Sequence, residues 1–561
     1  TGPANTMTWG IQAALGTRAN GVITNNVLKN LFEGVHLPGT NTAQNLTIEK
    51  NAVRNEGSPF QVAAGFWLAA GTLQGATIRD NSFSGLDKGV GADITSINLN
   101  GSSNVTVSGN ESSNDGSFLV VVNSSDIEVS GNTVSDESGS SIFIGKNVAD
   151  IEVTGNEISD GFRGIRLSNA IGGATLTHDV AINDNSISGI ETAALLVDAA
   201  AVSGNVEFLR NRIVETGNGI INDNDVEIDA TNNWWGCNGG PGEEGCSTAT
   251  GPNVTSPWVV LGSEAGKLRT IAGEPVTVTA LLDSNSDGET VDLPVLEKRE
   301  VAFTTTGGTV RPAAAAVNLG RAATALESAT ALGDVTVTAT FDGQTATSDL
   351  YVGAAPAIGS VALTGSGKAD EALTCTPDGV TGEPAPGVDI FWLKNGTAIP
   401  GQTGTTYTPV EGDVGSSISC RVEASNEFAT VSAESASIEI TKQPEPPAPK
   451  PPVVAPKPNV TVPKSGKVVI VTLKCPEGSC KVKAPRKVRI RIRGKVYVAK
   501  VKAPNKIGEG KSGKVRLVLP PRARKALKGA KTKAKVRIVI TSSDGKRKVV
   551  DRRFTLKGKR R

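Results

Sequence analysis

Methionine, histidine and aromatic residues are scarce in this chain of 561 residues, which holds one Met, two His and 4% aromatic residues. No stretch approaches the roughly 18 uncharged apolar residues of a membrane-spanning helix, which excludes such a segment. Leu, Met, Glu and Lys do not dominate with a helical period, which excludes a helical bundle. Val, Ile, Thr, Asn and Gly are abundant instead, and they predict short strands joined by tight turns.

The charges are divided unevenly along the chain, although the formal net charge is only +1. Residues 466–561 hold 33 Lys or Arg and four acidic residues, whereas the preceding 465 residues hold 24 and 52. An acidic body is therefore joined to a strongly basic end. Such a division indicates contacts with surfaces or polymers rather than a particular fold.

The six cysteines fall into three local pairs, each inside one expected domain. Even numbers in local pairs predict disulfides and an oxidising compartment outside the cytoplasm. Zinc is the alternative, but each pair lacks two further ligands nearby, and the only histidines are His36 and His178. The pairs are Cys237 with Cys246, Cys375 with Cys420, and Cys475 with Cys480.

A seven-residue pattern that ends in Asn recurs along the first 233 residues. Examples are NVTVSGN at 104–110, DIEVSGN at 126–132 and DIEVTGN at 150–156. The closing Asn residues stand 22 to 30 positions apart, so each unit is too short to bury a face alone and must stack on its neighbours. We expect each closing Asn to adopt positive φ and to bond to the adjacent coil. They are Asn26, Asn51, Asn81, Asn110, Asn132, Asn156, Asn185, Asn211 and Asn233.

A second short alternating run lies between the copies, as in Ile142-Phe143-Ile144. Over about residues 10–260 this pattern resembles the right-handed parallel β-helix, or pectin-lyase-like, family. Residues 232–258, NNWWGCNGGPGEEGCSTATGPNVTSPW, resemble the segment that closes such solenoids. The resemblance implies a cap in which Cys237 and Cys246 staple the loop. Three tryptophans would then cover the apolar end of the last coil, namely Trp234, Trp235 and Trp258.

Strand alternation predicts which side chains of each coil point outward. In the first strand of each unit this column is Thr47, Thr77, Thr106, Glu128, Glu152, Ala181, Glu207 and Glu227. We interpret it as a solvated acidic stripe, with a stripe that contacts calcium or substrate as the alternative.

The outward column of the second strand is richer in aromatic and charged residues: His36, Trp67, Asn98, Val120, Phe143, Arg166, Leu196 and Ile221. Aromatic rings beside His and Arg can stack on sugar rings and bond to acidic or hydroxyl groups. The competing interpretation is that loops cover these side chains and leave no groove. The candidate glycan contacts are His36, Trp67, Asn98, Phe143, Arg163 and Arg166.

Many members of the pectin-lyase-like family cleave or isomerise polysaccharides. Their polygalacturonase-like motifs Asn-Thr-Asp, Asp-Asp, Gly-His-Gly and Arg-Ile-Lys are absent here, as is the Asp-Pro-His of alginate epimerases. Hydrolysis needs paired carboxylates, and a lyase needs a base and a cation for the uronate. Asp160, Arg163 and Arg166, or Asp223 and Asp225, could be considered, but nothing raises them above an acidic, turn-rich surface. The catalytic residues are therefore unknown, and we favour a protein that is not an enzyme.

Residues 263–353 and 355–441 alternate in short runs typical of β-sandwiches. The first stretch resembles invasin-type bacterial Ig-like domains. In the second, Cys375, Trp392 and Cys420 follow the Ig-like order, with Trp expected against the disulfide. Residues 406–426 resemble bacterial Ig-like repeats, and Ile418 stands where antibody-type domains have a Tyr.

The loop LLDSNSDGE places Asp283, Asn285 and Asp287 at alternate positions before Gly288, like the start of a calcium-binding EF-hand loop. Pro294 stands where the bidentate Glu would be. We favour a hairpin turn, with calcium as the alternative, and we expect no other cofactor.

Residues 442–465 are Pro-rich and predict an extended linker. Residues 466–561 alternate apolar with basic residues, and PPRARKALKGA predicts a short helix. Nucleic acid is not expected as a partner, because aromatic residues are nearly absent and the disulfides indicate an extracytoplasmic setting. Anionic wall polymers, acidic polysaccharide or lipid headgroups fit better; contact with the acidic body or simple solubility are the alternatives.

The sequence thus predicts an all-β protein: a right-handed parallel β-helix, two Ig-like sandwiches and a small basic β-rich module. The chain opens at Thr1 and its one Met is Met7, so we expect a mature form or a fragment of a secreted or cell-surface protein. We expect it to bind glycans or to be displayed to them, and to hold an anionic envelope; a polysaccharide lyase or glycoside hydrolase is the alternative. The sequence does not predict the oligomeric state. The expected domains are 1–260, 263–353 and 355–441, the linker 442–465, and the basic module 466–561.

Overall fold

The computed structural model of the chain is almost entirely β, as the sequence predicted. It folds as two compact units, residues 1–367 with 371–440, and residues 368–370 with 441–561. No helix in the described part of the chain is long and apolar enough to cross a membrane. The structure describes residues 9–12, 17–39, 42–56, 64–69, 72–86, 94–172, 175–327, 331–444, 453–456 and 459–559.

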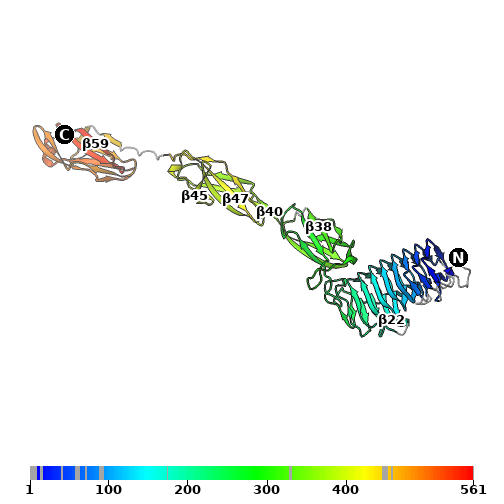
Figure 1. Cartoon of the computed structure of the whole chain (residues 1–561). Helices are drawn as coiled ribbons and strands as arrows, with labels where there is room; N and C mark the ends of the chain where they lie inside the picture. Colours follow the sequence, from blue (N-terminus) through cyan, green and yellow to red (C-terminus); the bar gives the residue numbers. More distant parts are fainter. Residues whose placement is uncertain are drawn as a thin grey trace. The chain divides into compact units, whose positions relative to one another are not determined.

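The N-terminal domain is a parallel β-helix in which three sheets run along the stacked coils (Figure 1). The second sheet runs from β2 (Thr17–Ala19) to β31 (Asn253–Val254), and the third from β4 (Val27–Lys29) to β27 (Arg212–Val214). The first sheet comprises, in order, β1 (Trp9–Gln12), β5 (Glu33–Leu37), β9 (Ala64–Leu68), β13 (Thr95–Asn100), β16 (Ser117–Val122), β19 (Ser140–Lys146), β22 (Arg163–Gly172), β25 (Leu195–Val197), β28 (Ile220–Asn222) and β30 (Ala249–Thr250).

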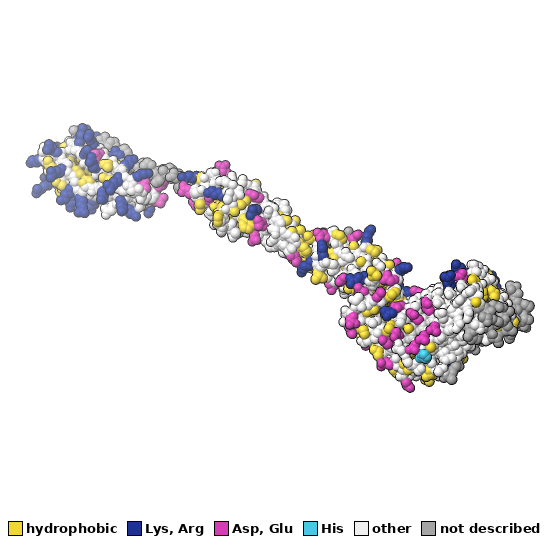
Figure 2. Space-filling model, viewed as in Figure 1, with side chains coloured by type: hydrophobic (Ala, Val, Ile, Leu, Met, Phe, Trp, Pro, Cys, Tyr) yellow, Lys and Arg dark blue, Asp and Glu magenta, His cyan; other side chains and the backbone are white. Residues whose placement is uncertain are grey.

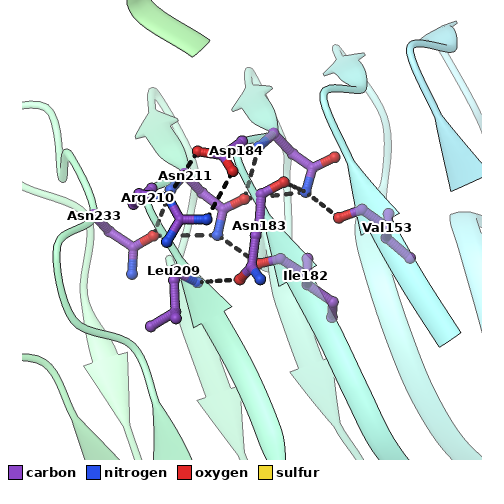
Figure 3. A network of polar contacts seen from close by, with 9 residues as sticks. Val153, Ile182, Asn183, Asp184, Leu209, Arg210, Asn211 and Asn233 are labelled. Carbon is purple, nitrogen blue, oxygen red and sulfur yellow. Dashed lines mark hydrogen bonds and ion pairs between the residues drawn. The ribbon is translucent and has the colours of Figure 1, made fainter. Parts of the chain in front are cut away.

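The closing Asn of each coil forms a buried ladder along the β-helix. The side-chain Nδ2 of Asn110 donates to Oδ1 of Asn132 at 2.9 Å and to the carbonyls of Ile78 and Ser108. The same Oδ1 accepts the backbone N–H of Asn110 at 2.9 Å. Figure 3 shows this arrangement at the C-terminal end, where Asn211 bridges Ile182 and Asn233. The predicted bond to the adjacent coil is therefore confirmed.

The expected positive φ at these Asn residues was wrong. The left-handed residue is the one before each of them, for example Gly109, Gly131 or Asp184. A left-handed residue at that position bends the chain from one sheet of the coil to the next, so that the Asn side chain that follows enters the interior. Glycine, Asn and Asp tolerate this conformation best, which explains their frequency there.

The cap of the β-helix differs in part from the prediction. Trp235 is fully buried in the β-helix core and Trp258 packs against that core, as expected. Trp234 is equally buried, but it belongs to the core of the following sandwich, with Val214 and Val259. The β-helix and the first sandwich are therefore joined by a shared apolar contact.

The first sandwich has two facing sheets. One contains β32 (Gly262–Ala265), β34 (Val276–Leu281), β38 (Arg321–Glu327) and β36 (Thr309–Arg311). The other contains β33 (Arg269–Ile271), β40 (Gln344–Ala357), β39 (Gly333–Phe341), β35 (Glu300–Thr305) and β37 (Ala314–Ala316). β40 continues into the second sandwich, where it pairs with β43 (Thr381–Glu383).

The second sandwich is Ig-like. Its sheets are β41 (Ser360–Thr364), β42 (Leu373–Asp378) and β46 (Thr406–Tyr407), and β45 (Thr397–Thr403), β44 (Gly387–Lys394), β47 (Ser417–Ser425) and β48 (Thr430–Glu434), with β49 (Ile438–Glu439) beside β47. The disulfide Cys375–Cys420 joins the two sheets, and the buried Trp392 lies directly opposite Cys420. The predicted Trp against the disulfide is confirmed.

The basic module is a third sandwich-like unit. One sheet contains β50 (Val453–Pro456), β52 (Lys467–Lys474), β57 (Ser512–Val518), β55 (Lys495–Lys502) and β54 (Lys487–Ile492). The other contains β51 (Asn459–Val462), β59 (Arg547–Gly558), β58 (Lys531–Thr541), β53 (Cys480–Lys483) and β56 (Lys506–Ile507). The helix α1 (Pro521–Ala526) lies where PPRARKALKGA predicted it.

Part of the predicted linker is strand rather than linker. β50 and β51 both lie within 442–465, and they pair with β52 and β59 of the basic module. Each stands at the edge of its sheet, where a proline such as Pro456 removes no central ladder bond. The other two predicted disulfides, Cys237–Cys246 and Cys475–Cys480, also form.

Candidate functional sites

The outward column of the first sheet forms one continuous row. Each member lies directly opposite the next in the parallel register, at the spacing of adjacent strands, and all are partly buried. Five of the six candidate glycan contacts therefore stand in this row, whereas Arg163 lies three residues before Arg166, at the start of β22. The row is His36, Trp67, Asn98, Val120, Phe143, Arg166, Leu196 and Ile221.

Arg166 is held rigidly at one part of this row. Its Nη2 and Nε donate to the carboxylate of Asp198 at 2.8 and 3.2 Å, and the Ser168 hydroxyl donates to the same carboxylate at 2.6 Å. The guanidinium carbon lies 5.8 Å from the ring centroid of Phe143. A paired, fixed guanidinium beside a ring can bind the edge and face of a planar or hydroxylated ligand. Sequence reasoning missed Asp198, which follows the next strand of the sheet, β25.

Arg163 lies close to the same charges. Burial lowers the pKa of Arg163, the neighbouring Arg166 lowers it further, and Asp198 acts in the opposite direction. Its guanidinium lies 4.2 Å from the Phe162 ring centroid. Its Nε is buried and has no hydrogen-bond partner among the described residues. Both arginines therefore lie within the electrostatic influence of Asp198, but among the described residues only Arg166 forms an ion pair with it.

His36, at the other end of the row, is also fixed by its neighbours. Its Nδ1 bonds to the carboxylate of Glu33, which is buried on the same strand. The ring of Trp9 lies 5.3 Å from the His36 ring, between centroids. Neither partner was predicted. Further along, the Oδ1 atom of Asn98 is buried without a hydrogen-bond partner among the described residues.

The acidic column of the second sheet follows the predicted order up to Glu207. Glu128 and Glu152 are direct neighbours and both are exposed. The last position was wrong, because Asp229 and not Glu227 lies opposite Glu207. The final copy of the repeat contains extra residues, which shift its register by two positions.

The predicted calcium loop is engaged with other parts of the protein. Asp283 pairs with Arg321, Nε to Oδ2, at 2.6 Å. Asn285 is buried; its Nδ2 donates to Asn232 of the β-helix cap at 3.0 Å, and its Oδ1 accepts the N–H of Glu289. Among the described residues, no group of three or more His, Cys, Asp or Glu could hold a metal ion. Calcium at Asp283, Asn285 and Asp287 stays a prediction.

Two carboxylates lie inside the wall of the β-helix, at positions that no sequence pattern singled out. The Ser112 hydroxyl bonds to Oδ2 of Asp115 at 3.0 Å and to Oε1 of Glu137 at 2.8 Å. Burial raises the pKa of Glu137 well above its usual value, and the negative charge of Asp115 raises it further. Both are at most 1% exposed, so this pair contributes to the interior and not to a solvent-facing catalytic site.

The basic module places like charges opposite one another on both sheets. Cations that face each other across paired strands destabilise a sheet. Five such pairs occur among the described residues: Lys481 with Lys506, Lys487 with Lys500, Lys502 with Arg516, Lys531 with Lys557, and Lys535 with Arg553. Figure 2 shows Lys and Arg spread over the visible face of this module. Asp551 offsets only part of this charge, through Arg537 at 2.8 Å and Lys535 at 3.4 Å.

Comparison with known proteins agrees with the architecture of the N-terminal domain. Residues 69–234 match the family described as the right handed beta helix region. Together with the three parallel sheets, this match makes the N-terminal domain a right-handed parallel β-helix, as the repeat predicted. No curated protein matches the chain at a significant level.

Several solved structures are similar to part of the chain at low identity. A three-Ig fragment of titin, domains I67–I69, is 14% identical over 54% of this chain and 98% of its own, with a TM-score of 0.23. The D1–D4 ectodomain fragment of ICAM-5 is 12% identical over 53% and 77%, with a TM-score of 0.24. A C-terminal 282-residue fragment of intimin, in complex with the intimin-binding domain of its translocated receptor, is 16% identical over 36% and 69%, with a TM-score of 0.22.

Proposed function

We propose that this is a secreted or cell-surface protein whose basic module holds an anionic envelope polymer, while its β-helix binds glycans or is displayed to them. The observation that carries the proposal is the set of five cross-strand cation pairs. A sandwich with a complete apolar core gains no stability from opposing Lys and Arg. A polyanion that lies across these strands would relieve the repulsion and gain electrostatic energy from both partners of each pair.

The aromatic residues of the module argue against nucleic acid as that polyanion. Single-stranded nucleic acid is usually bound by exposed rings on which bases stack. Phe554 is only 3% exposed and belongs to the core, and Tyr497 is partly buried beside it. A polymer of phosphate or carboxylate groups needs no such rings, because it is bound through charge alone.

The β-helix would supply the second contact. The row from His36 to Arg166 combines rings, an amide and a fixed guanidinium at strand spacing, which suits the repeating faces and hydroxyls of an extended glycan. The pairing of Arg166 with Asp198 supports binding more than lyase chemistry, because its charge is already partly neutralised.

Retention on isolated bacterial cell envelopes tests the first part of the proposal. The full chain should bind at low salt and be released at high salt. The double variant Lys500→Glu/Lys514→Glu should bind much more weakly, since both side chains are exposed on the basic module. Lys29→Glu/Lys267→Glu, an equal charge change outside the module, is the matched control and should bind as the wild type does. Absent or salt-insensitive binding would refute the envelope contact.

Glycan binding by the row is tested by a screen of neutral and acidic polysaccharides. Trp67→Ser should abolish binding, and Leu196→Ser at the same column should change it little. Products with new reducing ends or unsaturated bonds that disappear in Arg166→Ala would instead establish the alternative, a hydrolase or lyase.

A further inference from the structure

The basic module contains a cavity of about 650 Å³ where α1 meets the ends of β51 and β59. Its lining combines apolar and cationic side chains. Val462, Pro463 and Leu527 supply the apolar part, together with Gly529 and Gly558. The cationic part consists of Lys464, Arg524, Lys525, Lys528 and Lys559. This volume lies within the range of small-molecule sites in proteins.

The cavity is built by close backbone approaches rather than left by loose packing. A side-chain Cβ on Gly558 would lie 1.9 Å from the carbonyl oxygen of Leu527, so only glycine lets β59 pass the end of α1. A Cβ on Gly466 would lie 2.4 Å from Cδ of Arg524. The Nη1 atom of Arg524 donates to the carbonyl of Lys464 at 2.5 Å, which fixes the guanidinium at the cavity wall.

The charges at the cavity are not matched by acidic partners. No acidic side chain is among the residues that line it. Asp544 and Asp551, two of the four acids of the module, are engaged with Lys546 and Arg537 elsewhere. The Nε–H of Arg524 is buried and has no hydrogen-bond partner among the described residues. This atom is closed off from solvent, so an anionic ligand in the cavity would be bound by the positive charges of Arg524 and the lysines rather than by this N–H.

We propose that this cavity binds a single anionic phospholipid. The phosphate would lie among Arg524 and the lysines, and the first methylenes of the acyl chains would lie on Val462, Pro463 and the aliphatic stems of the lysines. A free phosphate would use the cations but leave the apolar part empty. A polar polymer repeat would do the same, so the mixed lining favours an amphiphile. The inference goes beyond the proposed function, because it assigns a lipid to the cavity, whereas the proposed function assigns an anionic polymer to the outer surface of the module.

Calorimetric titration of the full chain with short-chain lipids below their micelle concentration tests the proposal. Dihexanoyl-phosphatidylglycerol should bind, glycerol 3-phosphate should bind at least about tenfold more weakly, and dihexanoyl-phosphatidylcholine should not bind measurably. Longer acyl chains should raise the affinity, by up to about fourfold for each methylene that is buried. Equal affinity for glycerol 3-phosphate and the lipid would overturn the proposal in favour of a simple phosphate site.

Two variants with the same charge change separate this cavity from the outer surface. Lys525→Glu/Lys528→Glu alters its rim, and Lys500→Glu/Lys514→Glu alters the sheet outside it; all four lysines are exposed. The first variant should lose at least about tenfold in lipid affinity, and the second should keep it. Equal losses would overturn the proposal. Both variants should bind an envelope polymer more weakly than the wild type does. If the wild-type chain binds the lipid but no polymer, the proposed function is refuted and the lipid site remains.

Discussion

The indole Nε1–H of Trp234, in the last coil of the β-helix, donates to Oδ2 of Asp342, in the β39–β40 turn of the first sandwich, at 2.8 Å. The same carboxylate oxygen accepts from Nε of Arg212 on β27 at 2.8 Å. Trp234 also lies 5.6 Å from the Phe341 ring, between centroids. One carboxylate therefore links two domains through two residues of the β-helix.

Asp342→Asn should weaken this junction. The substitution removes the negative charge that forms an ion pair with Arg212. Asn, like Asp, tolerates the left-handed φ of 49° at this position. Because the ion pair is largely buried, we expect a loss of about 1–3 kcal/mol in the transition that unfolds the β-helix and first sandwich, measured by calorimetry. Asp349→Asn on β40 is the control, since among the described residues that exposed carboxylate bonds only to Thr336, at 2.7 Å. Equal shifts in the two variants would contradict a role for the junction.

Glu137 should make the stability of the β-helix depend on pH. Its folded pKa lies above its unfolded value, so its contribution is fully present below the unfolded pKa and is lost as pH rises through the folded pKa. Glu137→Gln should remove this loss and stabilise the domain at neutral pH by about 1 kcal/mol or more. Thermal unfolding from acidic to neutral pH measures it, with the exposed Glu111→Gln as the control. A wild type and Glu137→Gln that respond to pH identically would exclude this explanation.

The Asn ladder should be most sensitive at its centre. Asn132→Ala removes an acceptor for the buried N–H groups of Asn110 and also breaks the bond to Asn156, so we expect a loss of about 2–4 kcal/mol. Asn26 is the first Asn of the ladder among the described residues. Asn26→Ala therefore leaves no N–H of an earlier ladder Asn in that part without its acceptor, and it should cost about 1 kcal/mol. Chemical denaturation measures both. A ladder without energetic importance would show equal, small effects.

Lys500→Glu should change stability and binding in opposite directions. The substitution replaces a repulsion with Lys487 by an attraction, so the basic module should become more stable by about 0.2–1 kcal/mol. Its affinity for an anionic polymer should fall at the same time. Unfolding by denaturant and binding to polyglycerol phosphate measure the two effects. A variant that is both less stable and unchanged in binding would remove the reason for the proposed function.

The periodic features of the fold could be predicted from the sequence. Alternation with a period of two places His36, Trp67, Phe143 and Arg166 outward, and coil closure places them in one row. The prediction failed where the period is interrupted, as at Glu227, where extra residues shift the register. It also assigned positive φ to the closing Asn, because the pattern alone does not separate a turn residue from the buried residue that follows it.

The contacts that depend on docking between distant residues could not be predicted. Asp342 stands 108 positions after Trp234, and no repeat relates the two residues. In the second sandwich, the Tyr407 hydroxyl donates to Oδ2 of Asp413 at 2.7 Å. Ile418 stands at the position where antibody-type domains have their corner Tyr. Burial and the bond to Asp413 raise the pKa of Tyr407 to about 12. Such pairs depend on the folded geometry and leave no periodic signal in the sequence.

The central claim is that the basic module binds an anionic polymer through its surface charges. The most direct test measures the equilibrium affinity of the full chain for polyglycerol phosphate across a series of salt concentrations. We predict a linear fall of log affinity with log salt, with a slope of about 0.7–0.9 for each phosphate neutralised, and a smaller slope for Lys500→Glu/Lys514→Glu. Absent binding, or an affinity that does not change with salt, would contradict the claim.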